Sequence, residues 1–114
     1  MKNQETVIFD KVSLNEGNAY DNTSGVFTAP SDGIYSFSWT ILTASEKYFI
    51  SEIVHNGVKI AYNYADGRGL NAYLMSTSHA NIKMKKNEQV WIKASDTNGK
   101  YAHDGYCYFS GEKL

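Results

Sequence analysis

Polar residues able to bind a ligand gather in three stretches in the second half of the chain. They are Asp66, Arg68 and Asn71; Asp96, Asn98 and Lys100; and His103 and Asp104, with Tyr101 close by. Asn and Asp make directional hydrogen bonds to hydroxyl groups, and a tyrosine ring can stack on the face of a sugar. Arg68 carries a planar fork that pairs bidentately with a carboxylate, such as that of an acidic sugar. These residue types predict non-covalent recognition by loops, set against the simpler interpretation that each is an ordinary turn residue.

No motif typical of catalysis occurs in the sequence. It contains no G-x-S-x-G elbow, no H-E-x-x-H pair, no Walker loop and no pair of cysteines. His55, His79 and His103 stand more than twenty residues apart, so none has a second histidine at the spacing of a metal site. We therefore expect a protein that is not an enzyme, with histidines that lie at the surface or form hydrogen bonds.

Length and charge fit one globular domain, residues 1–114. Eleven basic and twelve acidic residues give a net charge of −1, which argues against binding to nucleic acid or to an anionic membrane. No apolar run approaches the ~20 residues of a membrane-spanning helix, so insertion into a membrane is not expected. Cys107 is the only cysteine and is expected to be a buried, unreactive thiol.

One short motif bears on where the protein works. Asn22 begins an Asn-Thr-Ser glycosylation sequon in a predicted turn, which favours a secreted, extracellular protein. Residues 1–5 are polar and do not form a signal peptide. We expect the signal peptide of such a protein to lie outside this sequence.

Strands must position the loop residues, because the hydrophobic pattern predicts strands throughout. Residues 34–42 alternate bulky apolar and small polar side chains, as a half-buried strand does. Asn56-Gly57 lies between two apolar runs and predicts a type I′ hairpin. Further strands are predicted at residues 6–9, 12–14, 26–28, 47–55, 58–64, 71–80, 81–84, 89–94 and 106–109. No segment has a helical apolar stripe, so the pattern indicates an all-β sandwich.

The aromatic residues are too numerous for one buried face. The chain has 9 Tyr, 5 Phe and 2 Trp. Trp91 alternates with Val90 and Ile92, and Tyr106 and Tyr108 alternate with Cys107 and Phe109, so these strands carry two apolar faces. We expect Trp91, Tyr106 and Tyr108 to lie in an oligomer interface. The alternative is that these residues simply favour strands and tolerate solvent.

Eight residues in the first third of the chain occur at a spacing that closely resembles the signature of the globular C1q domain. They are Phe9, Asn15, Tyr20, Phe27, Gly33, Tyr35, Phe37 and Trp39, the last standing where the family more often has Phe or Tyr. The stretch Ser24–Pro30 and the ending Tyr108–Gly111 are similar to the family as well. The resemblance implies a jelly-roll β-sandwich of about ten short antiparallel strands. By the same resemblance, we expect the family's usual first strand to be lacking or replaced in this sequence.

The resemblance also implies partners. It suggests a bell-shaped homotrimer, and some similar trimers bind calcium near the three-fold axis. In this chain Asp66 and Asn63, with Asp96, offer oxygen ligands of the kind that calcium prefers.

Two functions are consistent with the sequence. In the first, the trimer is a lectin-like recognition module of innate immunity that binds carbohydrate or other microbial or cell-surface ligands through its loops. In the second, it is a trimerising assembly or cytokine-like signalling head whose partner is a protein receptor. Fold resemblance does not choose between them.

Overall fold

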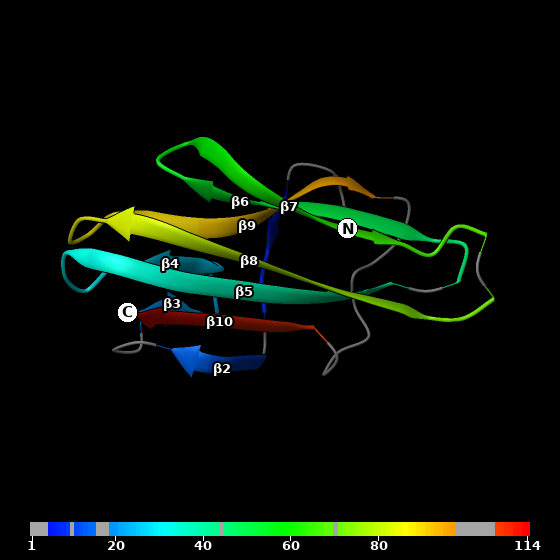
Figure 1. Ribbon diagram of the computed structural model, residues 1–114, viewed down its shortest axis with the longest axis horizontal. Coiled ribbons are helices and arrows are strands. Elements are labelled where there is room, and N and C mark those ends of the chain that lie inside the picture. The colour runs from blue at the N-terminus through cyan, green and yellow to red at the C-terminus, as the bar shows by residue number, and fades with distance from the viewer. Residues whose placement is uncertain (1–4, 10, 16–18, 44, 70, 98–106) are drawn as a thin grey trace.

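The computed structural model describes residues 5–9, 11–15, 19–43, 45–69, 71–97 and 107–114. These residues form ten strands and no helix, which confirms the predicted all-β class (Figure 1). The strands are β1 (Thr6–Val7), β2 (Lys11–Asn15), β3 (Tyr20–Asp21), β4 (Val26–Thr28), β5 (Gly33–Thr43), β6 (Tyr48–His55), β7 (Val58–Asp66), β8 (Leu74–Met84), β9 (Gln89–Thr97) and β10 (Tyr108–Lys113). None of the described residues belongs to a helix long and apolar enough to cross a membrane.

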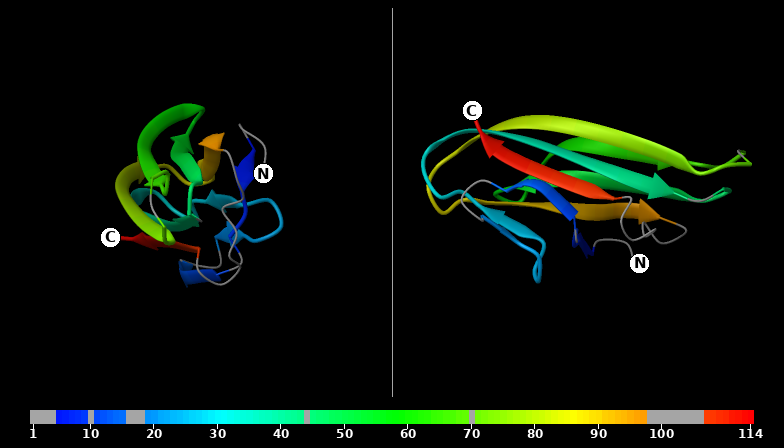
Figure 2. Two further views of the ribbon diagram at one scale, coloured as in Figure 1. Left: turned by 90° about the vertical axis from the view of Figure 1, so that its right-hand side faces the viewer. Right: turned by 90° about the horizontal axis from the view of Figure 1, so that it is seen from below.

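The strands form two sheets packed face to face (Figure 2). One sheet has the order β3-β4-β9-β6-β7, and β1 also pairs with β9; the other has the order β2-β10-β5-β8. Two short strands share one edge of β9, since β4 pairs with residues 89–91 and β1 with residues 92–93. The molecule is elongated, with extents of 44 × 25 × 23 Å, so loops from distant parts of the chain meet at its two ends.

Two features of the strands differ from the sequence-based expectation. The pair β2–β10 is parallel, whereas the other pairs between described strands are antiparallel. The two strands predicted at residues 71–80 and 81–84 are one strand, β8, which pairs with β5 from Leu74 to Met84. Local patterns miss both features, because pairing direction and strand continuity depend on the neighbouring strand.

The aromatic residues of the signature form the core. Phe9, Tyr20, Phe27, Tyr35, Phe37 and Trp39 are all buried, at 6% exposure or less. The rings of Phe27 and Phe37 meet edge to face at 4.9 Å, a favoured aromatic geometry. Gly111 of β10 passes close to both, because an added Cβ would lie 3.0 Å from the Phe27 ring and 3.1 Å from the Phe37 ring. The spacing of the signature is therefore a packing requirement of the sandwich.

A buried polar link joins the two sheets behind the aromatic core. The indole Nε1 of Trp39 on β5 donates to Ser51 Oγ on β6 at 3.0 Å. Asn63 on β7 donates through Nδ2 to the carbonyl oxygens of Trp39 and Ser76, at 3.2 and 2.9 Å. These hydrogen bonds of Trp39 and Asn63 satisfy polar groups that have no access to water and fix the sheets relative to each other. Cys107 is also buried, as expected.

The Asn56-Gly57 hairpin forms as predicted. Asn56 has φ of 52° and Gly57 has φ of 75°, the two positive values that a type I′ turn requires. This turn joins β6 to β7 at the left-hand end of Figure 1, beside the turn between β8 and β9. The left-hand end thus includes these two tight turns, together with the turn between β4 and β5.

Candidate functional site

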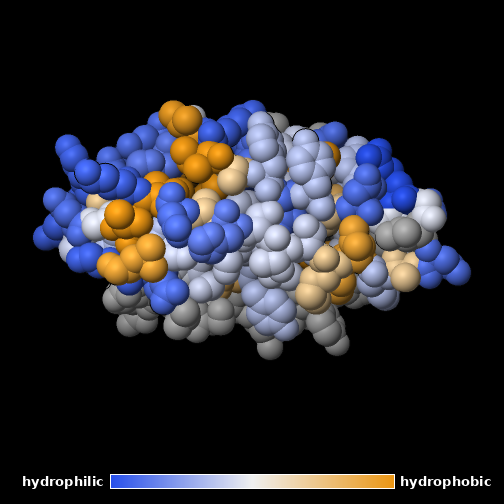
Figure 3. Space-filling model, viewed as in Figure 1, coloured by the Kyte–Doolittle hydropathy of each residue, from blue (hydrophilic) through white to orange (hydrophobic). Residues whose placement is uncertain are grey.

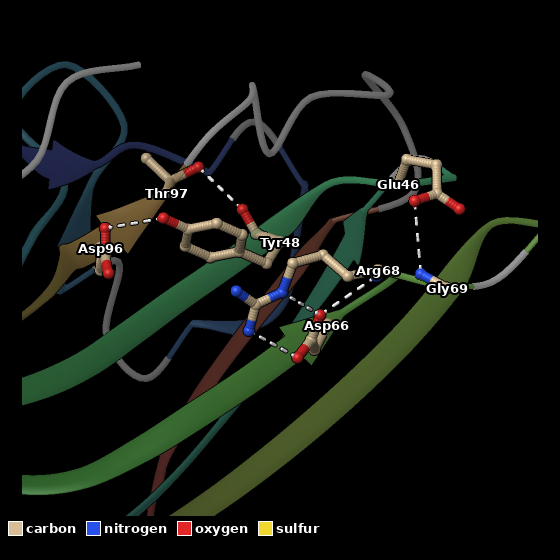
Figure 4. Close-up of polar contacts among 7 residues, drawn as sticks. All are labelled: Glu46, Tyr48, Asp66, Arg68, Gly69, Asp96 and Thr97. Atoms are coloured by element: carbon tan, nitrogen blue, oxygen red, sulfur yellow. Dashed lines mark hydrogen bonds and ion pairs between the residues drawn. The ribbon is translucent and has the colours of Figure 1, made fainter.

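At the right-hand end of Figure 1, a cluster of four residues includes three of the predicted site residues. We call Tyr48, Asp66, Arg68 and Asp96 the Arg68 cluster (Figure 4). Tyr48 at the start of β6 pairs with Asp66 at the end of β7, so the register of the hairpin places both side chains at this end. Arg68 follows in the turn, where its backbone N–H donates to Asp66 Oδ1 at 3.1 Å.

The guanidinium of Arg68 is engaged within the chain. Its Nε and Nη2 donate to the two carboxylate oxygens of Asp66, both at 2.9 Å, and its centre lies 4.4 Å from the Tyr48 ring centroid. Tyr48 donates from its hydroxyl to Asp96 Oδ1 at 3.2 Å. Arg68 thus forms the bidentate pair that was predicted for a bound carboxylate, but with the protein's own Asp66.

This pairing shows in the acid–base properties of the cluster. The side-chain hydrogen bond from Arg68, followed by its backbone N–H, lowers the pKa of Asp66 from 3.8 to about 2. The same pairing raises the pKa of Arg68. Desolvation, and then the bond to Asp96, raises the pKa of Tyr48. A fully ionised pair of this kind neutralises itself, so it offers little to an incoming charged ligand.

Of the other predicted loop residues, Asn71 is described, and it is exposed in the bend after the turn. Asn98, Lys100, Tyr101, His103 and Asp104 lie outside the described residues. Tyr48, which the sequence reasoning did not single out, links Arg68 to Asp96. Its position opposite Asp66 depends on the register shift between Ile53 and Val54, which the sequence does not reveal.

The predicted calcium ligands of one chain do not fit a shared ion. Asn63 is buried and faces the core, whereas Asp66 is exposed and has both oxygens bonded to Arg68. Asn63 Oδ1 is a buried oxygen without a hydrogen-bond partner among the described residues, yet Asp66 cannot reach the same side of β7. In the described part of the chain, no group of three or more His, Cys, Asp and Glu residues could hold a metal. Calcium shared between subunits stays a prediction.

The residues predicted for the oligomer interface lie on different sheets. Trp91 is half-buried on β9 of the six-stranded sheet, and Tyr108 is 38% exposed on β10 of the four-stranded sheet. Their strand neighbours Val90, Ile92 and Phe109 are buried, so both residues point outward, on opposite sides of the sandwich. Tyr106 lies outside the described residues. Trp91 and Tyr108 therefore do not form one continuous patch.

A second polar cluster lies at the opposite end, where the sequence reasoning placed no site. Glu88 Oε1 accepts from His55 Nε2 at 3.0 Å and from the backbone N–H of Lys85 at 2.9 Å, and its Oε2 accepts from Asn56 Nδ2 at 3.0 Å. We call His55, Asn56 and Glu88 the Glu88 cluster. The backbone N–H of Lys85, then Asn56 and His55, lower the Glu88 pKa from 4.5 to about 2. This carboxylate joins the two tight turns.

The glycosylation sequon occupies an accessible position. Asn22 is exposed in the turn between β3 and β4, where Asp21 Oδ1 accepts from the backbone N–H of Thr23 at 2.8 Å. Attachment of a glycan at Asn22 stays a prediction.

The topology and the loop clusters define a jelly-roll β-sandwich domain with a polar cluster at each end. A model of the family described as C1q domain matches residues 1–112. The chain belongs to the C1q domain family.

The relatives agree with this assignment. The human protein "Complement C1q and tumor necrosis factor-related protein 9A" is 32% identical over 103 residues, which is 84% of this chain and 29% of that protein. The mouse "Complement C1q tumor necrosis factor-related protein 7" is 30% identical over 109 residues, 92% of this chain and 37% of that protein. The chain thus spans about a third of the length of these relatives.

A solved structure supports the fold independently. The "Globular Domain of Zebrafish Complement 1qA protein" aligns with a TM-score of 0.54 at 13% identity, over 82% of this chain and 79% of that one. At this identity the likeness concerns the fold alone.

Proposed function

We propose that the chain is the recognition head of an extracellular protein, that it assembles as a homotrimer and that the trimer binds a protein partner without catalysing a reaction. The observation that carries the proposal is that large apolar side chains remain exposed on both outer faces of the sandwich. They are Ile34, Met75 and Tyr108 on the four-stranded sheet and Ile60, Tyr62 and Tyr64 on the six-stranded sheet. Exposed apolar side chains gathered on a face are typical of surfaces that meet another protein.

The outer face of the four-stranded sheet suits contact between copies. In its middle, Ser36 Oγ lies 2.6 Å from His79 Nε2, and Thr40 Oγ1 lies 2.7 Å from Thr77 Oγ1. Serine and threonine side chains, with one imidazole, leave a surface with few charges here, which shows in pale colours between apolar patches in Figure 3. Tyr108 pairs with Thr40 on this face. Interface cores are poor in charged residues and rich in tyrosine, so we assign this face to self-assembly.

The other outer face provides a separate surface for the partner. Ile60, Tyr62 and Tyr64 alternate along β7 and are 45%, 50% and 62% exposed. The two tyrosine rings lie 6.1 Å apart. Tyrosine is frequent among residues that dominate binding energy, because it buries a large rigid ring and keeps a polar group at its tip.

The relatives favour a protein partner over a sugar for the main function. Their names associate them with complement C1q and tumour necrosis factor, and the names do not mention lectins. The loop end predicted to bind carbohydrate holds Arg68 in a pair with Asp66, which weakens that alternative at that position.

Binding of the labelled protein to a panel of cells tests the proposal. We expect binding that is lost after the cells are treated with protease and kept after treatment with glycosidases. Tyr62→Ala and Tyr64→Ala should each weaken it about tenfold or more, as expected for interface hot spots. Tyr73→Ala, a change at a tyrosine of similar exposure (60%) outside β7, is the matched control and should have little effect. Binding that survives protease but not glycosidase would overturn the proposal.

A further inference from the structure

The two turns at the Glu88 end enclose an open cleft. Its volume is about 470 Å³, within the ~300–1,000 Å³ typical of sites for small ligands. The residues of its wall are Asn56 and Gly57 from the β6–β7 turn, Lys86 and Asn87 from the β8–β9 turn, and Glu88, Gln89 and Trp91. The cleft therefore combines one aromatic ring with a carboxylate, one lysine and three side-chain amides.

The wall is held in place by the backbone and by the carboxylate. Asn56 and Asn87 both have positive φ, at 52° and 74°, as in tight turns with few alternative conformations. The backbone N–H of Asn87 donates to the Ala29 carbonyl at 2.8 Å. Glu88 connects the turns through its bonds to His55 and Asn56. A wall that is already ordered loses little entropy when a ligand binds.

Several polar side chains of the wall extend to solvent. Asn56, Asn87 and Gln89 are exposed, and each amide offers both a donor and an acceptor. Trp91 is half-buried, in contrast to Trp39, which is fully buried in the core. The indole of Trp91 thus gives the cleft an apolar wall beside amides that both donate and accept.

We propose that this cleft is a binding subsite for the pyranose ring of a carbohydrate. The apolar C–H face of a pyranose packs against the indole of Trp91. The hydroxyl groups around the ring both donate and accept hydrogen bonds, which matches the amides of Asn87 and Gln89. The carboxylate oxygen Oε2 of Glu88, which accepts one bond from Asn56, is an additional acceptor for a sugar hydroxyl.

This subsite is separate from the partner surface on β7 and from the loops that the sequence pointed to. It lies at the left-hand end of Figure 1, whereas the Arg68 cluster lies at the right-hand end. It does not require the proposed protein partner. A single sugar needs only one chain, so a failure of the subsite and a failure of trimer assembly are distinguishable.

Fluorescence of the two tryptophans provides a direct test with monovalent sugars. Acrylamide should quench Trp91 and leave Trp39 nearly unaffected, because only Trp91 is accessible. Methyl glycosides of glucose, galactose, mannose and N-acetylglucosamine would be titrated to about 50 mM, since weak sites have millimolar Kd values. We expect at least one of them to protect Trp91 from quenching.

Substitutions locate the site. Gln89→Ala, and Asn87→Gly, which keeps the positive φ, should each weaken binding of that glycoside about tenfold. Arg68→Ala, at the opposite end, should leave it unchanged. Trp91→Phe, followed by saturation-transfer NMR on the glycoside, should also weaken binding. Protection by none of the glycosides, or equal sensitivity to Arg68→Ala and Gln89→Ala, would overturn the proposal.

Discussion

At one end of the sandwich the carboxylate of Asp66 pairs with a guanidinium. At the other end the carboxylate of Glu88 accepts hydrogen bonds from a backbone N–H, an amide and an imidazole. In both cases the carboxyl pKa is lowered to about 2. The consequences for recognition differ. The Arg68 pair satisfies both of its charges, while the bonds to Glu88 fix two turns and leave the amides and the indole beside them open to solvent. A charged residue in a loop is therefore poor evidence for a binding site until its partner is known.

A third carboxylate, in the middle of the six-stranded sheet, extends this comparison. Substitution of one of its partners is expected to have the largest effect on the free energy of unfolding. Glu52 is fully buried, and its Oε1 lies 3.6 Å from Lys59 Nζ and 3.8 Å from Lys93 Nζ. Removing one partner of a buried ion pair costs ~3–5 kcal/mol. Because Lys59 would remain, we expect Lys93→Met to lower the free energy of unfolding by about 2 kcal/mol.

Urea denaturation measures this effect. Lys59→Met is the control, because the Lys59 side chain is 53% exposed and that of Lys93 only 25%. Lys59→Met should lower the free energy of unfolding by less than Lys93→Met does. Equal stability of Lys93→Met and the unchanged protein would show that Glu52 does not depend on the lysine.

The next largest effect on stability is expected from substitution of two glycines, one at each end of the sandwich. Gly57 and Gly69 have φ of 75° and 81°, and an added Cβ at either would meet open space. Alanine at either position should therefore cost only the backbone strain, about 1–2 kcal/mol. Gly57 lines the cleft and Gly69 does not, so only Gly57→Ala should also weaken glycoside binding. A loss of glycoside binding in Gly69→Ala would contradict the assignment of the two ends.

A smaller effect concerns pH. The folded-state pKa values of Glu88 and Asp66 lie below their ordinary values of 4.5 and 3.8, so each carboxyl stabilises the fold above those values. That stabilisation is lost as the pH falls to about 2, starting from about 4.5 for Glu88 and from about 3.8 for Asp66. Glu88→Gln and Asp66→Asn should each make the urea midpoint fall less steeply over this interval. A steepness unchanged in both variants would show that neither carboxyl is held as described.

The smallest effect is expected at the Arg68 pair itself. The side chains of Arg68 and Asp66 are 56% and 44% exposed, and exposed pairs contribute little because water and salt screen them. Arg68→Ala should lower the urea midpoint slightly in low salt and not measurably in 1 M salt. A large, salt-independent loss would mean that the stacking of Arg68 on Tyr48 matters more than the charge.

The core could be predicted from the sequence because it depends on local spacing. Tyr35, Phe37 and Trp39 alternate along one strand, and all three are fully buried. The Asn56-Gly57 turn was equally clear, since only a few residue types adopt positive φ at both positions.

The Glu88 cluster could not be predicted in this way. His55 and Glu88 are 33 residues apart and meet because β6 pairs with β9, with His55 opposite Val90. Strand order of this kind is set by the whole sheet, so no local sequence pattern predicts it. The pairing of Arg68 with Asp66 could not be predicted either, because the sequence offers both as ligand-binding groups and does not show that one is the counter-ion of the other.

The assembly decides whether these sites act together, because three weak sites on one head bind a surface far more tightly than one. Sedimentation equilibrium at micromolar concentration measures it directly. We predict a mass three times that of the 12.8 kDa chain. Ser38→Arg, in the middle of the four-stranded face, should reduce the mass toward that of the monomer, and Thr23→Arg, in the exposed β3–β4 turn, should not. A monomeric mass for the unchanged protein would contradict the account.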